Sequence, residues 1–274
     1  MSLLLDAPAA IPQDLRGRTV VVVHAHPDDE AIFTGATVRR LADHGARVVL
    51  VTATGGELGE PKVPLAGRTM QQVRTAELER AAELLGVARL VLLGRRDSGL
   101  PGWESQRHPR ALIRADLPAV GRALARLVEA ERAEAVVGYD ADGIYGHPDH
   151  VAVHLMTRYA ASLAGVTAYE ATVDREHLHF AGAHLLDDAV KPIERPTYGR
   201  VTAEIPVALA ATAAELAVKR EALLAHASQI TPEMIADRFV ETYELEWFLR
   251  HGPSGVLDEL GNVHALAHAL AHAS

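Results

Sequence analysis

The first half of the chain alternates short apolar runs with segments of helical periodicity, and this alternation restricts the fold more than any other feature. Four runs are rich in β-branched residues, as expected of strands that are buried on both faces of a sheet: Arg18–Ala25, Arg47–Ala53, Arg89–Leu93 and Ala133–Gly138. A helical pattern follows each of them: Ala31–His44, Met70–Leu85, Ala111–Ala130 and His150–Ala164. Strands that alternate with helices predict an α/β fold with a doubly wound, mostly parallel sheet.

The second half of the chain has weaker patterns. We expect a strand at Thr167–Val173, an Ala-rich helix at Ala208–Ala225, and either a strand or a short helix at Tyr243–Arg250. Two long loops, Gly55–Thr69 and Asp97–Arg110, interrupt the alternation in the first half. Long loops on a rigid scaffold often carry function, so we expect both to border a binding site.

We predict one domain over residues 1–250, with its core at about 18–165 and a C-terminal elaboration, because the sequence has no internal repeat and no linker. Residues 251–274 form an Ala- and His-rich tail. Its histidines (His264, His268 and His272) share one face if the tail is helical. We interpret this face as packing on a partner subunit in a homo-oligomer rather than as a metal site.

The composition excludes several classes of function. The formal net charge of the 274 residues is −9 and the basic residues are scattered among acids, which argues against a nucleic-acid partner. No apolar run approaches the roughly 20 residues that span a membrane. The short apolar run near the start has no basic segment before it, so we expect a cytoplasmic protein. The chain has no cysteine, and any metal must therefore be bound by histidine and carboxylate.

Two polar motifs follow strands that such a sheet would place side by side. The first, His24–Glu30 (HAHPDDE), lies at the end of the first strand, and the second, Tyr145–His150 (YGHPDH), comes shortly after the fourth. In a sheet of order 3-2-1-4-5, these two strands are neighbours at the topological switch point, and ligands bind outside the carboxyl ends of the strands there. We therefore expect both motifs to face one crevice.

Histidine and aspartate are suitable ligands for a first-row metal, and catalytic zinc takes three protein ligands and a water. Two histidines and one carboxylate from the motifs would supply that set. Asp28 and Asp29 are adjacent and point in different directions in an extended segment, so one can bind the metal while the other accepts a proton from the attacking water. Taken alone, each motif could be a strand-to-helix turn in which the carboxylate caps a helix. Two motifs at matching strand ends favour the metal site.

A nucleotide-binding module on the same architecture is the competing class of function. It would need a Gly-rich turn after the first strand, where phosphate approaches the start of a helix. This chain has Pro27, Asp28 and Asp29 at that turn instead, and the two carboxylates would repel a phosphate. The sequence therefore argues against this class.

The paired motifs His26–Glu30 (HPDDE) and His147–His150 (HPDH) resemble the signatures of the PIG-L/LmbE-like N-acetylglucosaminyl deacetylases, which include the mycothiol- and bacillithiol-pathway deacetylases. The likeness runs from about Val20 to Ala164. Supporting similarity is found in four further segments: Thr52–Glu57, Arg74–Leu78, Asp97–Leu100 and Lys219–Gln229. The resemblance implies a Rossmann-like fold and a zinc-dependent hydrolase that removes an N-acyl group, typically N-acetyl, from a small molecule containing an amino sugar.

The resemblance also implies the metal centre. His26, Asp29 and His150 would bind zinc, and Asp28 would be the general base that takes a proton from the attacking water. Fe²⁺ is an alternative, because two histidines and one carboxylate with open positions also suit that ion. All the key polar positions are intact, which argues against a third class of function, a catalytically silent homologue.

Five further residues receive roles from the resemblance. His147 would stabilise the oxyanion or protonate the leaving amine, and Tyr145 would add a hydrogen bond to the same oxyanion. Asp149 would orient His147, with a helix cap as its alternative role. Arg74 and Asp97 match positions that hold sugar hydroxyls, and their alternatives are a surface ion pair and a loop cap.

The substrate is less constrained than the reaction. Ala31–Thr34 lacks the Ser- and Lys-bearing segment of the mycothiol branch, and Leu100 replaces a methionine of that branch, whereas Tyr139–Tyr145 is close to it. The alternatives are therefore an amidase of a larger conjugate, resembling the mycothiol-conjugate enzymes, and a tailoring deacetylase of a glycosylated natural product.

We interpret two further histidines as structural. His24 is expected to be a buried, hydrogen-bonded core residue, and His226 a packing residue.

Overall fold

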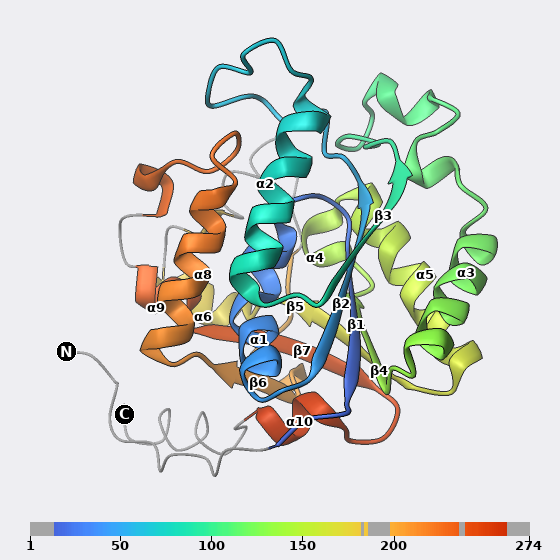
Figure 1. Ribbon diagram of the computed structural model, residues 1–274, viewed down its shortest axis with the longest axis vertical. Helices are drawn as coiled ribbons and strands as arrows, with labels where there is room; N and C mark the ends of the chain where they lie inside the picture. Colours follow the sequence, from blue (N-terminus) through green and yellow to red (C-terminus); the bar gives the residue numbers. More distant parts are fainter. Residues whose placement is uncertain (1–13, 182–183, 186–197, 236–238, 262–274) are drawn as a thin grey trace.

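The computed structural model describes residues 14–181, 184–185, 198–235 and 239–261. Seven strands in these ranges form one sheet of order β3-β2-β1-β4-β5-β7-β6 (Figure 1). Their bounds are β1 Thr19–His24, β2 Arg47–Thr54, β3 Arg89–Arg95, β4 Ala135–Tyr139, β5 Thr167–Thr172, β6 Val207–Ala210 and β7 Leu245–His251. The first five strands are parallel, and β7 pairs antiparallel with β5 and β6. The predicted fold class and the order 3-2-1-4-5 are confirmed.

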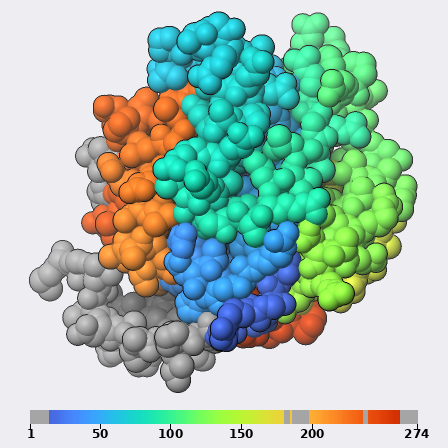
Figure 2. Space-filling model, in the orientation of Figure 1, coloured from blue at the N-terminus to red at the C-terminus, as the bar shows by residue number. Residues whose placement is uncertain are grey.

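Helices cover both faces of the sheet (Figure 1). On one face α1 (Asp29–Asp43) and α2 (Met70–Leu85) pack with α8 (Ala213–Ala225), and α2 and α8 lie against each other in the space-filling view (Figure 2). On the other face α3 (Leu117–Glu131) packs on α5 (Pro148–Ala164). The short helices are α4 Gly143–Gly146, α6 Arg175–Ala181, α9 Phe239–Tyr243 and α10 Val256–Leu260, with 3₁₀ turns at Glu104–Arg107, Leu112–Arg114, Thr202–Glu204 and Pro232–Ile235.

The central strands β1 and β4 support the two motifs, which lie at and beyond their carboxyl ends. Every residue of both strands is buried, and the four valines of β1 are at most 1% exposed. Burying one such side chain contributes about 1.5–3 kcal/mol, so this pair of strands is held firmly in place by the hydrophobic effect. The loops at their carboxyl ends therefore start from fixed positions.

The start of α3 differs from the prediction. The sequence predicts a helix from Ala111, whereas the residues before Asp116 form a bridge to Arg96 and a 3₁₀ turn. Asp116 is the N-cap, because its carboxylate accepts a hydrogen bond from the N–H of Ala119, and Pro118 lies in the first turn. A capping residue and an early proline fix the start of a helix more strongly than apolar periodicity does.

The Ala-rich segment predicted as one helix, Ala208–Ala225, is also two elements. Its first residues belong to β6, which pairs with β7, and the helix begins only after Thr212. Thr212 and Glu215 form a capping box, which is a strong start signal. The same pairing resolves the other alternative: the segment predicted as a strand or helix at Tyr243–Arg250 contains the strand β7.

After β7, helix α10 packs into the core of the protein. Val256 and Leu257 of α10 are at most 1% exposed. The three histidines of the predicted tail, at positions 264, 268 and 272, lie outside the described residues.

Candidate metal centre and active site

The two motifs meet at one pocket, as predicted from the topology. Residues Val20–Val22 of β1 pair in parallel with Ala135–Val137 of β4, so the segments that follow the two strands emerge side by side. These segments, the loops after β2 and β3 and the chain after α8 line a pocket of about 450 Å³. A cavity of this size accommodates a ligand larger than a single acetyl group.

The three residues predicted to bind zinc present three donor atoms to one point. His26 Nδ1, His150 Nε2 and Asp29 Oδ2 are each 3.4 Å from the other two. Ligands bound at 2.0–2.2 Å in a tetrahedral zinc site are about 3.3–3.5 Å apart. All three side chains are less than a tenth exposed. The donor set and its spacing therefore fit a tetrahedral divalent metal with a fourth position left for water or substrate.

The charges around His26 also favour a cation. Burial by itself lowers the pKa of this histidine, but the neighbouring Asp97, Asp149 and Asp29 outweigh burial and raise the pKa well above 6.5. Carboxylates that stabilise a proton on an imidazole would also stabilise a divalent ion bound to it. For Asp29, burial raises the pKa, but the nearby His150 and His26 hold it well below 3.8, so the ligand is ionised.

Asp149 contacts two histidines of the site, His26 through its carboxylate and His147 through its backbone N–H. Its Oδ2 is 3.3 Å from His26 Nε2 and accepts a hydrogen bond of 2.9 Å from the N–H of Ser98. Asp149 is the second residue of α5, and its own N–H points to His147 Nδ1 at 3.2 Å. A carboxylate on the far nitrogen of a ligating histidine fixes its tautomer and orientation.

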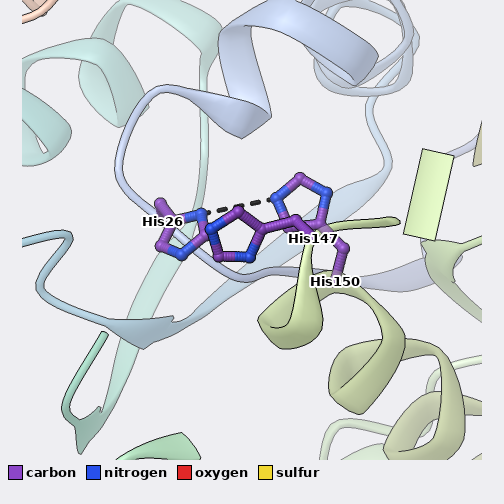
Figure 3. A group of neighbouring side chains, drawn as sticks. All are labelled: His26, His147 and His150. Carbon is purple, nitrogen blue, oxygen red and sulfur yellow. Dashed lines mark hydrogen bonds between the residues drawn. The ribbon is translucent and has the colours of Figure 1, made fainter. Parts of the chain in front are cut away.

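His147 is the N-cap of α5 and lies beside the ligand triangle. Figure 3 shows its ring with those of His26 and His150, and the ring centroids are 4.5 Å and 5.0 Å apart, respectively. Burial, together with the two other histidines, lowers the pKa of His147 well below 6.5. Because Nδ1 accepts the hydrogen bond from Asp149, the proton of the neutral ring is on Nε2. His147 can therefore donate a hydrogen bond to a substrate oxygen.

Tyr145 borders the same pocket. Its ring lies 5.1 Å from that of His150 and 6.0 Å from that of His147, and the side chain is 9% exposed. Burial and the nearby Asp29 raise the pKa of its phenol well above 10, so the hydroxyl stays protonated and is a donor. The preceding residue, Ile144, has a φ of 64°, which turns the chain sharply between β4 and α5.

Asp28 is held in a backbone conformation that non-glycine residues rarely adopt, with φ at 111° and ψ at −30°. Its carboxylate makes no helix-capping hydrogen bond, which removes the capping alternative considered for this residue. Burial raises the pKa of Asp28 to about 6, although Arg74 acts in the opposite direction. Strain of this kind, costing about 1–3 kcal/mol, tends to collect at active sites.

Arg74 is buried against the proposed base. Its guanidinium donates to Asp28 Oδ2 at 2.8 Å, to the carbonyl of Gly56 at 2.7 Å and to the carbonyl of Pro27. A Cβ at Gly56 would lie 2.3 Å from Arg74 Nη1, so only glycine admits the side chain here. The alternative of a surface ion pair is therefore wrong, because the side chain is only 4% exposed. Arg74 also lines the pocket.

Asp97 caps its loop and lines the pocket. Its Oδ1 accepts a hydrogen bond of 2.8 Å from the N–H of Gly99, which is the loop cap considered from the sequence. The carboxylate also lines the pocket, 3.7 Å from His26 Nε2. Burial raises its pKa, but His26 and the hydrogen bond from Gly99 outweigh burial and lower it.

Glu30 and His226 form a buried pair next to Asp28, and the sequence did not predict this contact. Glu30 accepts the N–H of Asp28 at Oε2 (3.0 Å), and its Oε1 is 2.6 Å from His226 Nε2. Both side chains are 0% exposed. His226 comes from the end of α8, so the C-terminal half of the chain supports the strained turn of the first motif. The sequence favoured packing for His226 over an approach to the site, and no spacing rule connects it to Glu30.

Comparison with known proteins agrees with this geometry. The profile of the PIG-L family, described as GlcNAc-PI de-N-acetylases, matches residues 21–161. This chain belongs to that family. A relative from Salinispora arenicola is 37% identical over 244 residues, covering 79% of this chain and 77% of its own length. It is named 1D-myo-inositol 2-acetamido-2-deoxy-alpha-D-glucopyranoside deacetylase. The predicted family is confirmed, and so is the predicted enzyme class, a deacetylase among the hydrolases.

Solved structures share the fold. The N,N'-diacetylchitobiose deacetylase from Pyrococcus horikoshii has a TM-score of 0.57 and 20% identity, and the match covers 85% of this chain and 84% of that one. The 4-carboxy-2-hydroxymuconate hydratase from Pseudomonas putida has a TM-score of 0.60 and 17% identity, with 87% and 98% covered. Because two different reactions occur on this fold, its function depends on the site.

In the described residues, no helix is long and apolar enough to cross a membrane.

Proposed function

We propose that this protein is a metal-dependent de-N-acylase that removes an acetyl group from the nitrogen of an amino-sugar-containing small molecule. The observation that carries the proposal is the triangle of donor atoms from His26, Asp29 and His150, with Asp28 beside it in one pocket. The named activity of the relatives supports the amino-sugar substrate. The two histidines and one carboxylate suit zinc, and ferrous iron is the alternative.

A metal in this site would supply Lewis acidity, which polarises the amide carbonyl. Asp28 then takes one proton as water adds to the carbonyl carbon, and the negative charge forms on the former carbonyl oxygen. His147 Nε2–H and the Tyr145 hydroxyl stabilise that oxygen, because both are neutral donors that border the pocket. The proton held by Asp28 passes to the nitrogen as the C–N bond breaks. Acetic acid and the free amine form, and at neutral pH they leave as acetate and the protonated amine.

The substrate test uses purified protein reloaded with zinc and a panel of N-acetylated compounds. The panel contains the N-acetylglucosaminyl-inositol pseudodisaccharide, N-acetylglucosamine and N,N'-diacetylchitobiose, together with a thiol conjugate of the pseudodisaccharide. We expect acetate and free amine in equal amounts from at least one acetamido sugar. Faster cleavage of the conjugate would favour the alternative of an amidase, and no acetate from any compound would contradict the proposal.

The structure predicts how the loss of Arg74 affects catalysis. If its contact with Asp28 is the important one, Arg74→Met lowers kcat by about 10-fold or more and leaves KM within about twofold, because the base loses its orientation. Steady-state kinetics on the preferred acetamido sugar measure both constants. Arg80→Met, on the exposed side of the same helix, is the matched control and leaves both unchanged. A rise in KM with unchanged kcat would instead identify Arg74 as a residue that binds the sugar.

A further inference from the structure

Tyr139, the last residue of β4, lies against two of the three proposed metal ligands. Its hydroxyl oxygen is 2.8 Å from Asp29 Oδ2. Its ring stacks on the ring of His150, with 4.2 Å between the centroids and 9° between the planes. The side chain is 0% exposed. None of the roles derived above for the deacetylase reaction uses this residue.

The direction of the hydrogen bonds follows from the number of protons. The Tyr139 hydroxyl has one hydrogen and a carboxylate can only accept, so that hydrogen is donated to Asp29. The hydroxyl oxygen must then accept from its other two partners, the N–H of Ala25 at 2.9 Å and His24 Nδ1 at 3.0 Å. His24 in turn lies with Nε2 2.8 Å from the hydroxyl of Thr34.

This network joins three elements behind one ligand atom. Ala25 follows β1, Tyr139 ends β4, and Thr34 lies in the second turn of α1. Asp29 Oδ2, the atom that receives the hydrogen bond, is also the atom 3.4 Å from both ligating nitrogens, and it accepts a second hydrogen bond from the N–H of His26. Two hydrogen bonds from the protein therefore end on the same oxygen that lies beside both ligating nitrogens.

A purely structural explanation accounts for part of this arrangement, because a buried tyrosine hydroxyl needs some partner. It does not account for the choice of partner. The hydroxyl bonds the ligand oxygen itself and the ring covers the second ligand, so both contacts end on the metal centre. Groups in such positions set the orientation and basicity of metal ligands.

We infer that Tyr139 is a positioning residue that holds Asp29 and His150 in the geometry of the metal centre and thereby sets its affinity for the ion. The inference rests on the proposed function for the identity of the ligands. It concerns metal binding and does not depend on which substrate is hydrolysed.

Tyr139→Phe is the direct test, because it keeps the ring over His150 and removes only the hydroxyl. We expect the dissociation constant for zinc to rise by about 10- to 100-fold. Titration against a chromophoric chelator measures it without substrate. The visible spectrum of the cobalt-substituted variant is expected to differ from that of the parent protein, since the carboxylate is free to rotate. Thermal unfolding of the metal-free proteins shows whether the variant is folded.

Tyr169→Phe is the matched control. Tyr169 is 0% exposed on the neighbouring strand β5, and its hydroxyl donates to a carboxylate, Asp258 Oδ2, at 2.6 Å and away from the metal centre. We expect its zinc affinity within about twofold of the parent value. Thr34→Val, an isosteric change at the far end of the network, should weaken zinc binding in the same direction as Tyr139→Phe, and it replaces that variant in the test should the latter fail to fold.

Zinc affinity that is unchanged in Tyr139→Phe, or lowered equally in Tyr169→Phe, would overturn the inference. The outcome is separate from the test of function. A protein whose zinc affinity depends on Tyr139 but which releases no acetate would contradict the proposed reaction and leave the positioning role standing. If instead the parent protein releases acetate and Tyr139→Phe has unchanged zinc affinity, the proposed reaction stands and the positioning role is contradicted.

Discussion

Replacing His150 with alanine is expected to remove most of the bound metal. His150 supplies one of three donor atoms and is 0% exposed near the start of α5. After dialysis, the variant should retain less than about 0.1 metal ion per chain where the parent retains about one, because a site of three protein ligands loses most of its affinity with one of them. Elemental analysis measures this content, and hydrolysis should fall to the background rate.

His154→Ala is the control for this experiment. His154 lies one turn further along α5, and its Nδ1 is 3.0 Å from the carbonyl of Tyr139 and 3.1 Å from Glu170, outside the ligand triangle. It should retain its metal. A His150→Ala protein that retained a full complement of metal would mean that the ligand set is wrong, and His147, whose ring lies beside the triangle, would be the first alternative ligand to examine.

Asp28→Asn should separate metal binding from catalysis. The amide has the size of the carboxylate but cannot take a proton from water, so the rate of hydrolysis should fall by about 10²- to 10⁴-fold while the metal content stays near one per chain. Asparagine tolerates a positive φ better than most residues, and the strained turn should therefore persist. Acetate release and elemental analysis on the same sample give both numbers. Activity within a few-fold of the parent would contradict the assignment of Asp28 as the base.

The part of the site that could be predicted from the sequence is the part that the sheet topology determines. Strands of a doubly wound sheet bring the ends of β1 and β4 together, so the convergence of His26, Asp29 and His150 followed from the two motifs. Family resemblance then supplied the reaction. Neither source gives side-chain direction at the start of a helix, so the contact of the Asp149 carboxylate with His26 was not predicted.

Contacts across long sequence separations could not be predicted. Tyr139 and Asp29 are 110 residues apart, and Glu30 and His226 are 196 apart. Their pairing depends on how α8 and β4 pack around the first motif, and no local pattern records that packing. The predicted starts of two helices were wrong for a different reason. At Asp116 and Thr212 a capping side chain determines where the helix begins, whereas the apolar periodicity used for the prediction starts several residues earlier.

The central claim is that one metal ion, held by the two motifs, is required for amide hydrolysis in this pocket. The most direct measurement is a titration of zinc into the stripped protein with acetate release from an acetamido sugar followed on the same sample. We expect no activity without metal, a linear rise with added zinc, and a plateau at one ion per chain. Full activity of the stripped protein, or a plateau that requires two ions per chain, would contradict the claim.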